Sequence, residues 1–161
     1  MLHRLFHTPD DHTLTLLRAG LGVVFFAHGA QKMLGWFGGA GFNGTVGYFG
    51  HTLGIPEVFA VLAILAEFLG GIGLILGLFG RIAAFALAVD MFVALFLVHV
   101  NNGFFMNWAG NKHAEGFEFH ILAICMLFAV MVRGAGAWSL DRLLDRSAAH
   151  AIPVHYHPQT T

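Results

Sequence analysis

Four stretches of the chain are almost entirely apolar over lengths that suit a membrane-crossing helix. They run over residues 14–34, 57–79, 82–100 and about 115–132. A helix needs roughly 20 apolar residues to cross the hydrocarbon core of a bilayer. A soluble helical bundle would need polar outer faces, which these stretches lack. The pattern therefore predicts an all-α integral membrane protein, a four-helix bundle contained in residues 14–145.

The connections between the apolar stretches differ greatly in length. Gly80 and Arg81 leave almost no space between the second and third stretches, so we expect these to be antiparallel neighbours. The longer connections cover residues 35–55 and 101–114. The first of them is rich in glycine and aromatic residues, which favours an aromatic belt or a re-entrant lid at the membrane surface.

Positive charges predict the orientation. Most of the basic residues that flank the stretches fall on one side, with Arg18 close to it: Arg4, Arg81, Arg133, Arg142 and Arg146. Lys112 falls on the other side. Loops rich in arginine and lysine stay in the cytoplasm. We therefore expect both termini to be cytoplasmic, with residues 1–13 as a cytoplasmic N-terminal segment.

Composition agrees with this interpretation. Of the 161 residues, 57% are hydrophobic and 11% are charged, and the mean hydropathy is +0.72. Soluble domains carry about 25% charged residues, so we expect a multi-pass cell membrane protein in contact with the lipid bilayer. The sequence has no basic patch of the kind that indicates nucleic-acid binding. Cys125 is the one cysteine, which excludes an internal dithiol and means that electron chemistry would need a quinone, a cofactor or a partner.

Ionisable residues within the apolar stretches are the candidate functional residues. Each costs about 2.5–3.5 kcal/mol on insertion scales, so such residues usually face the bundle interior. Glu67 lies ten residues into the second stretch, and we expect His28 to be its partner. We identify both as candidate catalytic residues, although a purely structural pair fits the pattern equally well. Gly70, Gly71 and Gly77 share the face of Glu67 and predict the close approach of another helix.

Other polar residues complete the predicted site. Arg18 and Asp90 have matching predicted depths, and we expect them to form a structural ion pair. Four residues in the outer half of the stretches are candidate ligand-binding residues: Gln31, Lys32, His99 and His120. Solvated or snorkelling side chains near the membrane surface are the alternative for these four.

Residues 146–161 are predicted to form a disordered, histidine-containing tail. His155 and His157 have no third ligand, so we predict no metal site. Haem held by His28 with His99 or His120 is a weaker alternative to quinone, because no spacing in the chain demands it.

Five segments in this order resemble the DoxX family of small four-span membrane proteins. They are "RAGLGVVFFAHGAQKMLGW", "GFNGTVGYFGHTLGIP", "LAEFLGGIGLILGLFGRIAA", "FLVHVNNGFF" and "GAGAWSLDRLL". The resemblance covers roughly residues 15–145. It implies a subunit of an oxidoreductase, since relatives serve in a thiosulfate:quinone oxidoreductase, but it supplies no agreed catalytic set. The positions that match the polar signature of the family are Arg18, His28, Lys32, Glu67, Arg81 and His99.

The first hypothesis is a membrane-embedded subunit of an oxidoreductase system that interacts with a quinone in an outward-side polar pocket. His28, Gln31 and Lys32 would donate hydrogen bonds to the quinone, and Glu67 would relay protons. Electrons would come from a soluble redox partner or another subunit of a complex. The alternatives are a small-solute or lipid-binding transport protein, which would favour a homo-oligomer, and a membrane scaffold that anchors a partner enzyme.

Overall fold

The computed structural model of the chain describes residues 6–111 and 113–150, and no strand occurs within them. The longer helices are α2 (His12–Leu34), α4 (Glu57–Leu76), α5 (Gly80–Ala94) and α6 (Glu118–Arg133). The shorter ones are η1 (Trp36–Gly38), α3 (Gly41–His51), η3 (Val100–Asn102) and α7 (Leu140–His150). A π-helical segment, η2 (Leu95–His99), continues α5. The prediction of an all-α protein is confirmed.

Three helical stretches in the described part of the chain are long and apolar enough to cross a membrane: His12–Leu34, Glu57–Leu76 and Gly80–Asn102. Large apolar side chains on their outer faces are exposed, such as Leu16, Leu62 and Phe85. These faces suit contact with lipid, and the protein is a multi-pass membrane protein. At 16 residues, α6 spans about 24 Å, less than the roughly 30 Å of a hydrocarbon core. A fourth crossing, and with it the orientation of the termini, stays a prediction.

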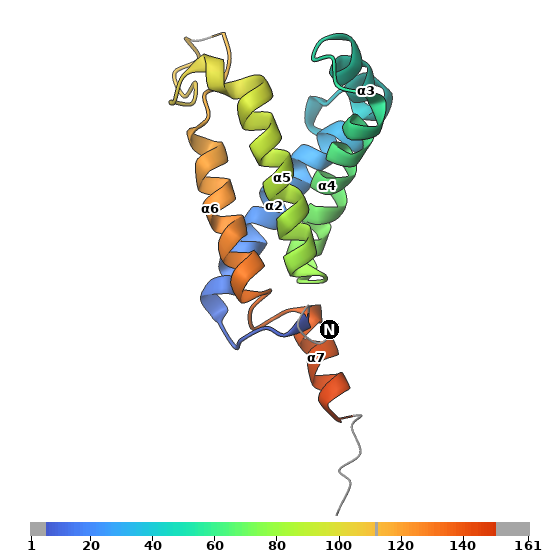
Figure 1. Cartoon of the computed structure of the whole chain (residues 1–161), viewed down its shortest axis with the longest axis vertical. Helices are drawn as coiled ribbons and strands as arrows, with labels where there is room; N and C mark the ends of the chain where they lie inside the picture. The colour runs from blue at the N-terminus through green and yellow to red at the C-terminus, as the bar shows by residue number, and fades with distance from the viewer. Residues whose placement is uncertain (1–5, 112, 151–161) are drawn as a thin grey trace, which may run out of the picture.

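The helices are arranged so that the molecule has two distinct ends (Figure 1). The first described residues and α7 lie at one end, which we call the terminal end. At the opposite end, the loop end, lie α3 and the connection between η3 and α6, described for residues 103–111 and 113–117. Contacts join α2 to α4, α4 to α5, α5 to α6 and α6 back to α2. Their shared apolar core includes Leu21, Phe25, Leu74, Leu87 and Leu127.

Glycines bring α2 and α4 into backbone contact. A Cβ atom added at Gly29 of α2 would lie 2.4 Å from the backbone nitrogen of Phe68. One added at Gly71 of α4 would lie 2.5 Å from the backbone nitrogen of Phe26. The predicted close approach of a helix to the face of Glu67 is therefore confirmed.

The other two glycines on that face have different neighbours. Gly70 packs against Leu87 of α5, with 3.1 Å between an added Cβ and the Leu87 Cγ atom. Gly77 ends α4 with φ +64°, a left-handed conformation that favours glycine, and packs against Ser139. The turn formed by residues 77–79 then leads directly into α5.

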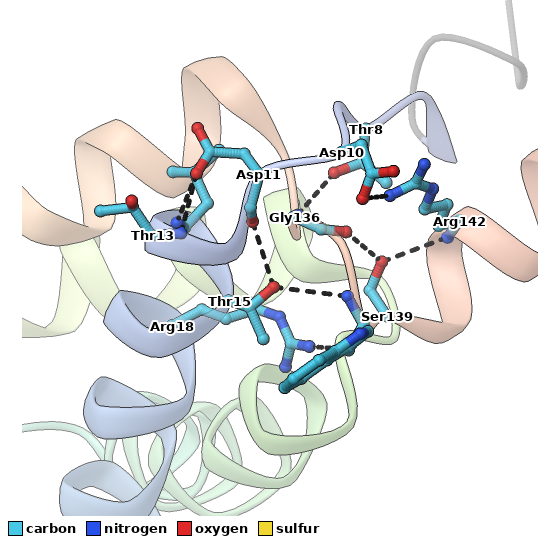
Figure 2. Close-up of polar contacts among 11 residues, drawn as sticks. Thr8, Asp10, Asp11, Thr13, Thr15, Arg18, Gly136, Ser139 and Arg142 are labelled. Carbon is cyan, nitrogen blue, oxygen red and sulfur yellow. Dashed lines mark hydrogen bonds and ion pairs between the residues drawn. The ribbon is translucent and has the colours of Figure 1, made fainter.

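Polar contacts fasten the terminal end (Figure 2). Arg18 is 1% exposed, and its guanidinium donates to the carbonyl groups of Leu74, Ile75, Ala135 and Trp138. The first two of these carbonyls lie in the last turn of α4, where a positive charge is favourable. This end of the molecule is therefore closed by a buried cation and the backbone around it.

The segments before α2 and after α6 are tied into the same region. The Asp11 carboxylate caps α2 by accepting from the backbone N–H groups of Thr13 and Leu14, at 2.9 and 3.1 Å. Thr8 accepts from the backbone N–H of Gly136 at 2.6 Å. Figure 2 also shows the ion pair between Asp10 and Arg142.

Two segments predicted without helix contain one. Residues 35–55 include α3, of which Thr45 alone is buried. The predicted disordered tail begins at residue 146, but residues 146–150 continue α7. Four residues named in the sequence analysis lie outside the described residues: Arg4, Lys112, His155 and His157.

Candidate functional site

A cavity of about 990 Å³ lies among the helices and reaches the loop end. Its volume is at the upper end of the usual range for sites that bind small organic molecules, about 300–1,000 Å³. Most of its lining is apolar. The ionisable residues of the lining come from every long helix and from both connections at the loop end: His28, Lys32, Tyr48, Glu67, Asp90, His99, Glu115 and His120.

An ion pair joins α2 to α4 in the cavity wall. The Lys32 Nζ atom lies 2.6 Å from the Glu67 Oε2 atom. Glu67 is 5% exposed, and the Lys32 side chain is 26% exposed. The close contact at Gly29 positions the pair, because Gly29 lies against the backbone of Glu67 and Phe68. Lys32 follows Gly29 by about one helical turn, so its side chain can reach the Glu67 carboxylate.

The ion pair differs from the predicted partnership of Glu67 with His28. His28 lines the same cavity and lies within electrostatic reach of both Lys32 and Glu67. The longer lysine side chain, one turn nearer the loop end, makes the contact with the carboxylate instead. His28 and Lys32 thus both face the cavity from one side of α2, as their spacing of four residues requires.

Asp90 places a second carboxyl group beside Glu67. Both residues line the cavity, and the Asp90 carboxyl interacts electrostatically with the Glu67 carboxyl and with the charge of Lys32. The hairpin of α4 and α5 explains this, because Glu67 lies ten residues before Gly77 and Asp90 lies ten residues after Gly80. Residues at equal distances from a tight antiparallel turn lie at the same level.

The predicted ion pair between Arg18 and Asp90 is wrong. Arg18 lies beside the turn, with its guanidinium on backbone carbonyls. Asp90 is about 15 Å farther along α5, at 1.5 Å of rise per residue. The equal spacing of the two carboxyls from the turn is the sequence signal that could have placed Asp90 at the cavity.

A pair of histidines forms another polar part of the lining. The rings of His99 and His120 have their centroids 4.2 Å apart. The His99 Nδ1 atom lies 2.9 Å from the Glu115 carbonyl oxygen; since a carbonyl can only accept, this nitrogen carries the hydrogen. His120 is 5% exposed, and its Nδ1 atom has no hydrogen-bond partner within the described chain.

The backbone around His99 is unusual. His99 ends the π-helical segment η2, and π-turns occur often at functional sites. His99 lines the same cavity as Asp90, which belongs to the preceding helix α5.

Gln31 does not line the cavity, in contrast to the predicted ligand-binding role. Its amide donates to the Phe37 carbonyl at 3.4 Å and so holds the connection that follows α2. Besides Asp90, five of the predicted catalytic and ligand-binding residues do line the cavity together: His28, Lys32, Glu67, His99 and His120. Elsewhere in the described ranges too, no three histidine, cysteine, aspartate or glutamate side chains are arranged to hold a metal ion.

Comparisons with known proteins identify relatives. The DoxX family profile matches residues 13–100. The chain is 36% identical over 132 residues to an uncharacterized protein of Haemophilus influenzae, covering 80% of this chain and 87% of that protein. It is 30% identical over 137 residues to the inner membrane protein YqjF of Escherichia coli, covering 85% and 95%.

A further relative has a name that refers to an activity. The chain is 32% identical over 92 residues to a Bacillus subtilis protein named "Putative oxidoreductase CatD", covering 57% of this chain and 63% of that protein. No solved structure matches the chain significantly.

Proposed function

Because the chain belongs to the DoxX family of membrane proteins, we propose that it is the membrane-embedded subunit of an oxidoreductase system and binds a quinone in the cavity. The observation that carries the proposal is the cluster of Lys32, Glu67 and Asp90 in the wall of an otherwise apolar cavity. The name of the Bacillus subtilis relative supports the redox class.

The cavity offers what a quinone needs for binding. The apolar lining suits the ring, and the two carbonyl oxygens of a quinone require hydrogen-bond donors. The Lys32 ammonium has three donors, of which one is directed to Glu67. His28 and His120 line the same space and add ring nitrogens.

The same residues can supply protons. Reduction of a quinone to a quinol takes two electrons and two protons, and each carbonyl oxygen becomes a hydroxyl group. Two neighbouring carboxyl groups share a proton readily, because two adjacent negative charges repel each other. The pair of Glu67 and Asp90 would give this proton to one quinone oxygen, and a protonated histidine of the cavity would serve the other.

The electrons must come from a second protein in this proposal. The chain has one cysteine, Cys125, so it cannot cycle between a dithiol and a disulfide within itself. A soluble redox partner or another subunit would deliver electrons to the bound quinone, as the sequence analysis expects.

The terminal end argues against a transport route through the protein. Alternating access would have to open this end, where Arg18 bonds to four carbonyl groups. A pure scaffold would have no need for ionisable groups inside the membrane, which are costly there. A binding site that is closed at the terminal end and open elsewhere fits these contacts better.

The experiment is to purify the protein in mild detergent, extract it with organic solvent and quantify quinone by mass spectrometry. We expect about one quinone per chain, and at least tenfold less in Glu67→Gln and Asp90→Asn. Glu57→Gln is the matched control, because Glu57 is an exposed glutamate on the same helix and does not line the cavity. Equal quinone in all four proteins, or none in the folded wild type, would contradict the proposal.

A further inference from the structure

The wall of the cavity between α4 and α5 consists of side chains that also face the outside of the protein. Leu62 of α4 is 55% exposed, and Phe85 and Val93 of α5 are 57% and 44% exposed, yet all three line the cavity. A residue that is both exposed and part of a cavity lining marks the edge of an opening. Because α4 and α5 are membrane-spanning helices, this opening faces lipid.

Side-chain size explains why the two helices separate here. Near the turn, Gly70 of α4 packs tightly against Leu87 of α5. Toward the loop end, the cavity is bordered on these helices by the small residues Ala63, Ala66 and Ala94. Small side chains facing a gap leave it unfilled, so the contact near the turn gives way to an opening.

The opening leads directly to the polar cluster. Ala66 precedes Glu67, and Val89 precedes Asp90, so the edges of the opening lie next to the two carboxyl groups. The loop end of the cavity is bordered by Tyr48 and by residues 53–56, in the connection between α2 and α4. The side opening lies between two helices that are long and apolar enough to cross a membrane, and is therefore the route from lipid to the site.

We propose that the ligand enters and leaves sideways, between α4 and α5, and that it is a bilayer-dissolved quinone whose hydrocarbon tail occupies this opening. Its ring would reach Glu67 and Asp90 while its tail remains among Leu62, Phe85 and Val93. This inference rests on the proposed function for the identity of the ring, but the opening toward lipid can be tested without any quinone.

The first test compares a long-tailed quinone in vesicles with a quinone that lacks the tail. Ala66→Trp and Ala94→Trp should fill the opening and lower the affinity for the long-tailed quinone at least tenfold, with a smaller loss for the tail-less one. Leu69→Trp is the control, because Leu69 is exposed on α4 but does not line the cavity. Unchanged affinity for the long-tailed quinone, or equal losses for both quinones, would overturn the route.

The second test needs no quinone. In a Cys125→Ser background, spin labels attached to single cysteines at Ala63 and Val93 would report collisions with oxygen, which dissolves in lipid, and with a water-soluble nickel chelate. Collision with oxygen should dominate at both sites, as at a Leu69 reference label. Dominance of the nickel chelate would show an opening to water, and low access to both reagents would show a covering protein surface; either result overturns the inference.

The two tests separate the two proposals. Labels that report lipid together with a folded protein that binds no quinone would remove the proposed function and leave the side opening in place. Quinone binding together with labels that report water would remove the side route alone.

Discussion

Arg18 and Asp141 hold opposite sides of the same three-residue turn. Arg18 donates to the carbonyl groups of Leu74 and Ile75 at the end of α4. Asp141 accepts from the backbone N–H groups of Phe79 and Gly80 at the start of α5, at 2.7 and 2.8 Å. Each charge complements the dipole of the helix end that it contacts. The hairpin that carries Glu67 and Asp90 is thus fixed at its turn, while its other end borders the cavity.

Arg18→Gln should destabilise the protein strongly. The variant leaves several buried carbonyl groups without their donor, and each unsatisfied buried group costs about 1–3 kcal/mol. Arg18→Lys should recover less than half of the loss, because an ammonium group lacks the planar fork of a guanidinium. Thermal unfolding in detergent, followed by circular dichroism, measures both effects.

Arg133→Gln is the control for Arg18. The Arg133 side chain is 61% exposed, and its guanidinium lies 3.9 Å from the Asp11 carboxylate, so its loss should cost at most about 1 kcal/mol. Equal destabilisation by Arg18→Gln and Arg133→Gln would show that Arg18 has no special place in the terminal end.

Gly29→Ala should disturb both stability and the ion pair in the cavity. The added Cβ atom would lie 2.4 Å from the Phe68 backbone, and relieving such overpacking costs about 1–3 kcal/mol. Separation of α2 from α4 would also move Lys32 away from Glu67, so quinone binding should weaken. Unfolding curves and the amount of bound quinone report the two effects.

Gly20→Ala tests whether the effect of Gly29→Ala is specific. Gly20 lies on the same helix, and a Cβ atom added there meets nothing within 4 Å. This variant should be neutral or more stable by up to about 1 kcal/mol, because alanine favours helix. A loss at Gly20 as large as at Gly29 would mean that helix α2 tolerates no added methyl group for reasons other than the contact with α4.

Hydropathy predicted the long helices to within a few residues, because their length and apolar character are local properties. The predicted start of the second stretch, residue 57, is the start of α4, and the predicted end of the first, residue 34, is the end of α2. The helix α3 was missed because its four glycines disfavour helix, so it depends on packing against α2 and α4.

The partners of the buried charges were harder to predict than their shared location. Sequence depth suggested Arg18 as the partner of Asp90, but depth counted along separate helices ignores backbone acceptors. The free carbonyl groups at the end of α4 lie beside Arg18 and satisfy it without any carboxylate. The contact of Lys32 with Glu67 was likewise not predictable from the depth of each residue in its helix. It depends on the register of α2 against α4, which the close contact at Gly29 sets.

The contribution of Asp10 should depend on pH. The hydrogen bond from Arg142 lowers the pKa of the Asp10 carboxyl below its usual 3.8. The pair should therefore stabilise the contact between the N-terminal segment and α7 fully above pH 3.8, and the contribution should be lost as the pH falls through the lowered pKa. At neutral pH, the Asp10→Asn variant should have a slightly lower melting temperature than the wild type.

The difference in melting temperature between Asp10→Asn and the wild type should shrink toward zero in acid. A side-chain carbon NMR titration of Asp10 in Arg142→Gln should show a return of the pKa toward 3.8. A difference that persists unchanged in acid would show that the effect of the substitution does not arise from the charge of Asp10.

His120→Phe separates a role in ligand binding from a role in folding. The buried Nδ1 atom of His120 has no hydrogen-bond partner within the described residues, and a buried polar atom without a partner destabilises a fold. Phenylalanine keeps the ring and its packing against His99, so the variant should unfold at the same temperature as the wild type or higher. Quinone affinity should nevertheless fall about tenfold, equivalent to about 1.4 kcal/mol, because a donor to the bound ring is lost.

His51→Phe, at the exposed end of α3, should leave both quantities unchanged. A His120→Phe protein that is less stable and binds quinone normally would assign this histidine to the fold and not to the site.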